Sequence, residues 1–545
     1  MVALVPRQSR LTEWHTLVVG LQGALVTGFI YAYSTYSNAL QDQLKLTESN
    51  KELIGLAPSV CNLFTTLCGL LLDRTSVRFC LILSAMMMSG SYVLYGLVGM
   101  KVIAVSQPMP LCFALSFVAS FGASFVVACT FSTLAKNFEA QRRSAVISVA
   151  KSWVGVASGV GTSIYIGFFP DNFDPAASHP DGEPRIRFLF FLAAICGVVP
   201  LAISGILRPL APTERSTAPL AVPEAYRLPA CYVISALLIA TTLASAFEHT
   251  MPFSIALVTL LLCPLALLVP SGRQAVLKVS AAPVAEYTAH EQPRSTEPDA
   301  SSRSNSTALD AQSPANRDPP AAGRSPLECG PAGMVKLPEF YLLFGATFAI
   351  QSGGLFLTTN LGSMVESRSG AAVAATTAVT IFSCFQGASR LVTGFVSDYI
   401  VSRGLPRTVV FPVLMLIMAL AHAILCLRGP IALLAGTALG GVAFGAVYPL
   451  LVLVITEVFG QERVASNYMI FDGLPGAIGV FLIGHLLVSY VYDQHTAAGE
   501  SECHGDDCFL LSHLIVVGVE AFGCILGAVL ASRTWVIYRT LARKN

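Results

Sequence analysis

Long apolar stretches alternate with short polar loops along the whole 545-residue chain. Most of these stretches hold about 20 residues, the length that an α-helix needs to cross the hydrocarbon core of a bilayer. We predict six membrane spans in the first part of the chain, at residues 14–36, 53–72, 79–98, 110–134, 145–169 and 188–207. Six more are predicted at residues 340–364, 371–396, 409–427, 431–458, 465–490 and 509–531.

Two shorter apolar runs, 228–246 and 253–269, lie between these sets and are joined by a tight turn at 248–252. They bring the expected number of spans to about 14 and are extra to a plan of twelve helices. The sequence therefore predicts an all-α, polytopic membrane protein. Its expected parts are a six-helix half (1–208), an extra helix pair (209–272), a linker (273–337) and a second six-helix half (338–545).

The composition supports a membrane protein, because 54% of the residues are hydrophobic and only 12% are charged. The net charge of +1 gives no sign of a nucleic-acid partner. Residues 1–10 are short and polar without a signal-peptide pattern, so we expect the first span to act as the insertion signal. The linker is rich in Ser, Ala and Pro, and we expect it to be a disordered cytoplasmic tether.

A short motif occurs twice, once in each predicted half. Glycine, aspartate and arginine stand at the same offsets in the two copies, which consist of Gly69, Asp73, Arg74 and Arg78 and of Gly394, Asp398 and Arg403. Two copies at one spacing indicate a duplicated membrane protein. A glycine near a helix end allows close helix packing, and an aspartate with its arginine can form a charged clasp at the membrane surface.

Most of the 33 Lys and Arg residues fall on one side of the predicted membrane, the side that holds both termini. We therefore expect cytoplasmic termini. Cys503 and Cys508 lie in the last outer loop, where an oxidising compartment would permit a disulfide.

The repeated motif resembles the loop signature of the major facilitator superfamily, between the second and third helices of each six-helix half. Several other stretches are similar to the nodulin-like branch of that superfamily. These are residues 27–40, Lys151 with Gly155, Ser158 and Thr162, Asn360-Leu361-Gly362, Gly387 to Arg390, and the Cys503 to Phe509 loop. The resemblance implies two six-helix halves that rock about a mid-membrane site. Asp472 and Glu520 depart from the branch's pattern.

Four charged residues fall inside predicted spans, where a charge costs several kcal/mol and is a functional candidate. Lys151 lies about 12 Å along a helix from Arg143, near the middle of the membrane. It could bind substrate or form a structural ion pair inside the first half. Arg390 could latch the halves or face the substrate, and Asp472 and Glu520 could bind a coupling proton or ion.

Uncharged candidates come from the helices that, by the resemblance, line the central path: Tyr31, Tyr36, Gln351, Thr359, Asn360 and Tyr448. A wet cavity with substrate would supply the partners that buried hydroxyls and amides need. Each tyrosine could equally serve packing.

We predict a secondary transporter for a small organic anion, with the lipid bilayer as its surroundings and with neither a cofactor nor a resident metal. No nucleotide-binding motif or catalytic cluster occurs in the sequence. One alternative is a transition-metal transporter that uses Asp472, Glu520, His485 and an outer-loop set of His495, Cys503, His504, Asp506, Asp507 and Cys508. A second alternative is a transporter-like receptor or scaffold whose linker recruits partners.

Overall fold

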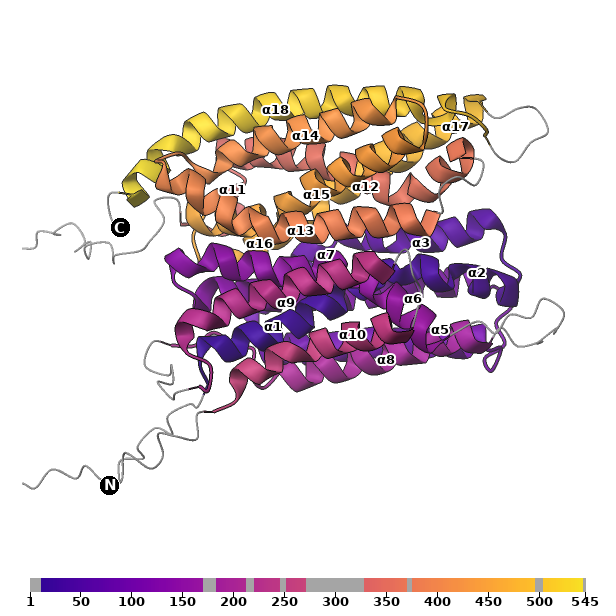
Figure 1. Cartoon of the computed structure of the whole chain (residues 1–545), viewed down its shortest axis with the longest axis horizontal. Coiled ribbons are helices and arrows are strands. Elements are labelled where there is room, and N and C mark those ends of the chain that lie inside the picture. The colour runs from indigo at the N-terminus through magenta and orange to yellow at the C-terminus, as the bar shows by residue number, and fades with distance from the viewer. Residues whose placement is uncertain are drawn as a thin grey trace, which may run out of the picture.

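The computed structural model describes residues 11–169, 183–211, 220–245, 251–270, 328–369, 375–495 and 503–542. These residues are helical, apart from turns and an isolated bridge between Leu220 and Pro270. Figure 1 shows two bundles of roughly parallel helices side by side, one from each half of the chain. The predicted all-α membrane fold is confirmed. Of the predicted linker, residues 273–327 lie outside the described residues.

The first bundle contains the helices α1 to α8. Their bounds are α1 Glu13–Gly28, α2 Tyr33–Leu44, α3 Glu48–Asn62, α4 Thr65–Arg74, α5 Val77–Gly99, α6 Pro108–Asn137, α7 Ala140–Phe168 and α8 Glu183–Ile203. The second bundle contains α11 Pro331–Met334, α12 Pro338–Ser369, α13 Ala375–Ser402, α14 Val410–Leu425, α15 Pro430–Val458, α16 Val464–Gly479, α17 Val488–His495 and α18 Asp507–Ala542.

The first two predicted spans are not continuous α-helices. After α1 the chain makes a 3-10 turn at Phe29–Ala32, and α3 and α4 meet at a bend of 42°. At the bend, the Thr65 hydroxyl bonds to the carbonyl oxygens of Asn62 at 3.1 Å and of Met469 on α16 at 3.0 Å. The break is therefore fixed by a contact with the other half. A π-helical stretch, Val480–Leu487, likewise joins α16 to α17.

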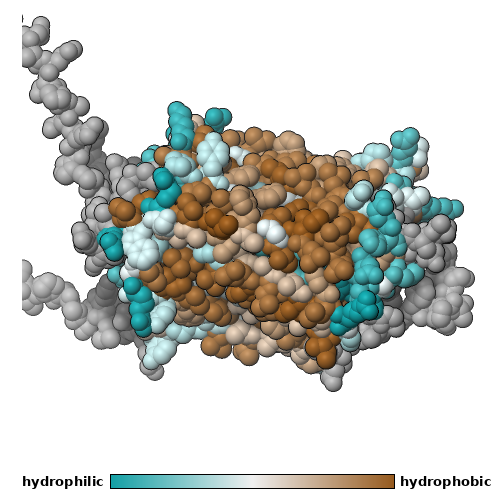
Figure 2. Space-filling model, turned by 90° about the horizontal axis from the view of Figure 1, so that it is seen from above, coloured by the Kyte–Doolittle hydropathy of each residue, from teal (hydrophilic) through white to brown (hydrophobic). Residues whose placement is uncertain are grey.

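Among the described residues, eleven helices are long and apolar enough to cross a bilayer, or twelve if the bent pair counts as one span. The space-filling view shows an apolar band around the middle of the molecule, with polar residues at both ends (Figure 2). An apolar band between polar borders, built from helices of this length, is the pattern of a protein that spans a membrane.

The extra helix pair is α9 Glu224–Ser245 and α10 Met251–Leu262, which continues as a 3-10 turn at Cys263–Leu268. α9 lies along α7, where the Trp153 indole N–H donates to the Ser235 hydroxyl at 2.9 Å. It also touches the second bundle: the ring centroid of Tyr232 on α9 lies 4.5 Å from that of Phe395 on α13. α9 therefore covers one side of the seam between the halves.

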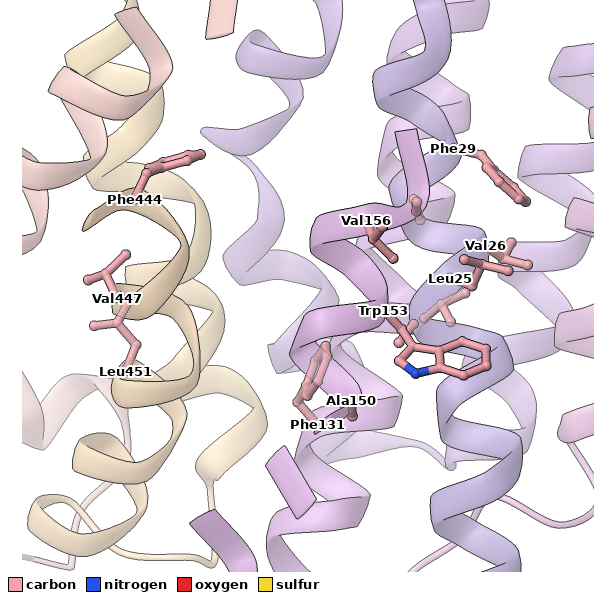
Figure 3. Close-up of a cluster of buried hydrophobic side chains, with 14 of the residues drawn as sticks. Leu25, Val26, Phe29, Phe131, Ala150, Trp153, Val156, Phe444, Val447 and Leu451 are labelled. Carbon is pink, nitrogen blue, oxygen red and sulfur yellow. The ribbon is translucent and has the colours of Figure 1, made fainter. Parts of the chain in front are cut away.

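The core of the first bundle is built around α7. Trp153 is fully buried and lies close to Leu25 and Val26 of α1, while Phe444 and Val447 of α15 belong to the core of the second bundle (Figure 3). Close packing needs a glycine here, because a Cβ on Gly28 would lie 2.3 Å from that of Ala157.

Residues 328–337, at the end of the predicted linker, pack on the second bundle. The Cys329 N–H donates to the Phe459 carbonyl at 3.1 Å, and the Asn467 side-chain amide donates to the Cys329 carbonyl at 2.8 Å. The segment contains the short helix α11, and Met334 is fully buried. Residues 328–337 thus belong to the second bundle, which begins before the predicted boundary at residue 338.

Candidate transport site between the two halves

Lys151 of α7 faces the second half in the middle of the bundle. Its Nζ donates to the hydroxyl of Tyr468 and lies 3.4 Å from Asp472 Oδ1, both on α16. The Tyr468 hydroxyl in turn donates to Asp472 Oδ1. The Lys151 side chain is 3% exposed and that of Asp472 is 17% exposed. Lys151 is therefore paired across the interface, not inside the first half.

Aromatic rings complete the surroundings of the Lys151 ammonium group. Nζ lies 4.0 Å from the ring centroid of Phe131 on α6 and 4.9 Å from that of Tyr468. A third ring, that of Tyr448 on α15, lies 5.5 Å away. Ring faces attract a desolvated cation, so these contacts help to offset its lost hydration.

Arg390 of α13 lies beside Lys151. Its Nη1 donates to the backbone carbonyl of Lys151 at 3.2 Å, and its guanidinium carbon lies 4.6 Å from the Tyr448 ring centroid. Arg390 is only 4% exposed. Two buried cations from opposite halves thus occupy one site, and the Arg390 contact with the Lys151 carbonyl also latches the halves.

The two helices that carry these cations approach closely at glycines. A Cβ on Gly155 of α7 would lie 3.1 Å from Gly387 Cα and 3.2 Å from Arg390 Cδ. On the other side of the interface, a Cβ on Gly473 of α16 would lie 2.5 Å from the Asn62 carbonyl oxygen. Small residues at both contacts set the distance across which Lys151, Arg390 and Asp472 meet.

The repeated motifs lie together at one end of the bundle, which we name the motif end. Asp73 Oδ2 accepts the backbone N–H of Ser466 at 3.3 Å, in the first turn of α16. A Cβ on Gly69 would lie 2.6 Å from the Ala465 carbonyl oxygen. The first motif is therefore packed against the second half.

The second motif makes the reciprocal contact. Asp398 accepts a hydrogen bond from the hydroxyl of Ser144 on α7, and a Cβ on Gly394 would lie 3.0 Å from the Ser144 carbonyl oxygen. Asp398 pairs with Arg407 at 2.8 Å. The motif led us to expect that Arg403 would pair with Asp398. This was wrong, because the guanidinium carbon of Arg403 lies over the Tyr399 ring, 4.8 Å from its centroid. Arg74 and Arg78 have no ion pair with a described residue.

The uncharged candidates are spread over several places. The side chain of Tyr31 lies outside the described residues, and Tyr36 packs against Tyr33 and Tyr95 within the first half. Gln351 is fully buried and donates to the Phe471 carbonyl at 2.9 Å. Asn360 donates to the Gly484 carbonyl at 3.1 Å, and Thr359 beside it is exposed. Of this group, Tyr448 contacts the two cations.

Glu520 lies away from Asp472, inside the second half between α12, α14 and α18. A Cβ placed on Gly353 would be 2.7 Å from Glu520 Oε1 and 3.3 Å from His422 Nε2. His422 and His513 meet through their Nδ1 atoms at 2.9 Å. Glu520 therefore lies in different surroundings from Asp472, which contacts Lys151 and Tyr468 at the interface.

Cys503 and Cys508 form a disulfide with a Cα–Cα distance of 6.0 Å. In the same loop, Asp506 forms two ion pairs. Its Oδ1 lies 3.8 Å from Arg368 Nε, and its Oδ2 lies 3.4 Å from Arg428 Nε. The described residues contain no group of three His, Cys, Asp or Glu side chains placed to hold a metal ion. His485, proposed as a metal ligand, has no described partner on Nε2.

Sequence reasoning missed Tyr468, Ser144 and Arg407. Tyr468 could have been found, because it stands four residues before Asp472 and so lies on the same face of a helix. Ser144 and Arg407 carry no such signal, since their partner Asp398 lies on another helix.

Two halves of membrane-spanning helices, with buried charges at their interface and reciprocal motif contacts, define a transporter of the major facilitator type. The solved structure of the proton:xylose symporter XylE, bound to 6-bromo-6-deoxy-D-glucose, shares this fold with a TM-score of 0.55. The two sequences are 11% identical, and the similarity covers 94% of each chain.

The Nodulin-like family matches residues 13–270, and the family described as NFD4, C-terminal domain, matches residues 327–542. The chain therefore belongs to the nodulin-like branch of the major facilitator superfamily. The family and the fold are those of transporters, not enzymes.

Two curated proteins are similar to parts of the chain. The oxalate:formate antiporter of Oxalobacter formigenes is 32% identical over 148 residues, which are 27% of this chain and 35% of that protein. Protein NUCLEAR FUSION DEFECTIVE 4 of Arabidopsis thaliana is 27% identical over 214 residues, 37% of this chain and 36% of that protein. The chain thus spans about a third of the length of these relatives.

Proposed function

We propose that this transporter moves a small organic anion by alternating access, with Lys151 and Arg390 as its cationic anchor. The observation that carries the proposal is their geometry: Arg390 Nη1 lies 3.2 Å from the Lys151 carbonyl, and both side chains are buried at the interface. A carboxylate is the natural partner of two such groups, because charge-assisted hydrogen bonds are strongest where water is excluded.

The partial similarity to an oxalate:formate antiporter supports this substrate class. Its name contains two small carboxylates. The similarity covers about a quarter of this chain, so it is the pair of cations that carries the argument.

The motif end is proposed to face the cytoplasm, with both termini, because most Lys and Arg residues lie on that side. The halves are in contact there through Asp73 and Ser466 and through Asp398 and Ser144. This conformation would be closed to the cytoplasm. The roles of the motifs as a gating clasp, and of Tyr448 as a cavity residue, belong to this proposal.

No observation favours the transition-metal alternative. The disulfide withdraws the Cys503 and Cys508 thiolates from the pool of ligands, and Asp506 is engaged by Arg368 and Arg428. A receptor or scaffold role would not need two buried cations at the interface, since each is costly to hold there.

The test is uptake by lipid vesicles that contain only the purified full-length protein. We expect uptake of labelled formate, labelled oxalate or both, and a fall of at least about a hundredfold in Lys151→Met, because a buried anion would lose its charged partner. The control is Lys101→Met, at an exposed lysine, which should transport normally. Uptake of iron or zinc in place of either anion would contradict the proposal, as would normal flux in Lys151→Met.

A further inference from the structure

The interface site holds two cations and one acid. Lys151 and Asp472 form an ion pair at 3.4 Å, and Arg390 donates to the Lys151 carbonyl. The Arg390 guanidinium also lies over the Tyr448 ring. With all three groups ionised, the trio carries one net positive charge, and without Asp472 it would carry two.

The acid is connected to Lys151 by two routes. One is the direct contact with Nζ, and the other passes through the Tyr468 hydroxyl, which accepts from Lys151 and donates to Asp472 Oδ1. Tyr468 and Asp472 stand one helical turn apart on α16, so a single rigid helix presents both. Asp472 therefore occupies the position that a bound carboxylate would take beside Lys151.

We propose that Asp472 is the countercharge of the empty site, and that it allows this carrier to return without cargo and so to carry out net transport instead of obligatory exchange. This inference rests on the proposed transport of an organic anion. It concerns the empty half of the transport cycle, which the substrate class alone does not determine.

The physical reason is the cost of an uncompensated charge. A carrier whose buried cations are neutralised only by cargo cannot change conformation empty without exposing those cations to a low-dielectric environment. Such a carrier exchanges one anion for another. Here Asp472 supplies a negative charge whether or not cargo is bound, and because the pair lies at the interface between the halves it can persist while they rock about it.

The distribution of exposure agrees with this role. Asp472 has a side chain that is 17% exposed, whereas that of Lys151 is 3% exposed. The acid thus lies at the accessible edge of the site and the lysine behind it. An incoming carboxylate meets Asp472 first and can take over its contacts with Lys151 and Tyr468.

The experiment compares two fluxes from the same vesicles. Vesicles are loaded with labelled formate or labelled oxalate, and the membrane potential is held at zero with potassium and an ionophore. Net efflux is measured into medium free of the anion, and exchange is measured into medium that contains the unlabelled anion. In the wild type we expect both fluxes at rates within about threefold of each other, since Asp472 keeps Lys151 paired when the site is empty.

In Asp472→Asn we expect the ratio of net efflux to exchange to fall by at least about a hundredfold, because only the empty return loses its countercharge. Retained exchange also shows that the variant is folded. Asp472→Glu, the matched control, keeps the charge and should keep net efflux.

Wild-type protein that exchanges either anion but shows no net efflux would overturn the inference and leave the proposed function standing. So would Asp472→Asn with undiminished net efflux, or with both fluxes lowered equally. Wild-type protein that moves neither anion in either assay would instead refute the proposed substrate class.

Discussion

Asp73 Oδ2 accepts the backbone N–H of Ser466 at 3.3 Å, so the aspartate of the first motif is bound to a helix of the opposite half. The aspartate of the second motif repeats this relationship in reverse, since Asp398 accepts from Ser144 of the first half. The two contacts differ in strength. Asp398 also pairs with Arg407, whose side chain is 6% exposed, whereas Asp73 is an exposed residue.

We therefore predict an asymmetric effect of neutralising the two aspartates. Asp398→Asn removes a partner of a buried arginine and should destabilise the conformation closed at the motif end by about 1–2 kcal/mol, because Glu457 still pairs with Arg407 at 2.9 Å. Asp73→Asn weakens one solvated hydrogen bond and should shift the balance by less than about 1 kcal/mol.

The measurement is the rate at which an impermeant maleimide labels one cysteine at each end of the helix bundle. Cys329, whose carbonyl is bound by Asn467 at 2.8 Å, reports on the motif end, and an added Thr359→Cys reports on the exposed site of α12. Asp398→Asn should speed labelling at Cys329 and slow it at Thr359→Cys. Equal patterns in the two aspartate variants would contradict the asymmetry.

Tyr468→Phe tests the indirect route between Lys151 and Asp472. The substitution removes the hydroxyl that joins them but keeps the ring, 4.9 Å from Lys151 Nζ. The direct ion pair remains, so we expect apparent anion affinity to weaken by about threefold to tenfold, equivalent to one hydrogen bond, without loss of maximal flux. Concentration dependence of formate and oxalate uptake provides the measurement. Complete loss of transport would show that the hydroxyl does more than join the pair.

Gly155→Val tests the close approach of α7 and α13. The new side chain would meet the backbone of Gly387, which cannot move aside as a flexible side chain can. We expect a loss of about 1–3 kcal/mol in stability, seen as a lower unfolding temperature in detergent. The matched control is Gly518→Val on α18, where a Cβ would have no neighbour within 4 Å. Similar unfolding temperatures for the two variants would exclude tight packing at Gly155.

Because Cys503 and Cys508 form a disulfide, the number of thiols that react in the unreduced protein can be predicted. The chain has 14 cysteines, and all except Cys503 and Cys508 are free. Protein denatured without reductant should therefore react at 12 thiols, and the full set should appear after reduction. Cys503→Ser should free the thiol of Cys508. Full reactivity of the unreduced wild type would remove the disulfide and make both thiolates available to a metal.

The arrangement of spans could be read from the sequence because the bilayer imposes one length on every crossing helix. The break between α3 and α4 could not. Its apolar pattern is continuous, and the bend depends on Thr65 meeting the Met469 carbonyl, a residue far away in the chain. Likewise, the short 3-10 turn after Gly28 interrupts no hydrophobic run.

In the candidate site, a charge inside a predicted span correctly identified individual residues of the site. It did not identify which residues contact one another. It singled out Lys151, Arg390 and Asp472, which lie together in the structure. It also suggested a common role for Asp472 and Glu520, which occupy different places, because depth along a helix does not say which face a side chain occupies. Arg403 was preferred to Arg407 for a similar reason, since repeat position does not determine the direction of a side chain.

The position of α9 has a mechanical consequence. It is joined to the first half by hydrogen bonds from Trp153 to Ser235 and from Tyr232 to the Ala145 carbonyl. Toward the second half it presents the Tyr232 ring to Phe395 and the Ile239 carbonyl to the weakly bonding thiol of Cys384. We therefore expect α9 to move with the first half and to slide over the second when the halves rotate. In that position it would keep lipid tails out of the seam that it covers.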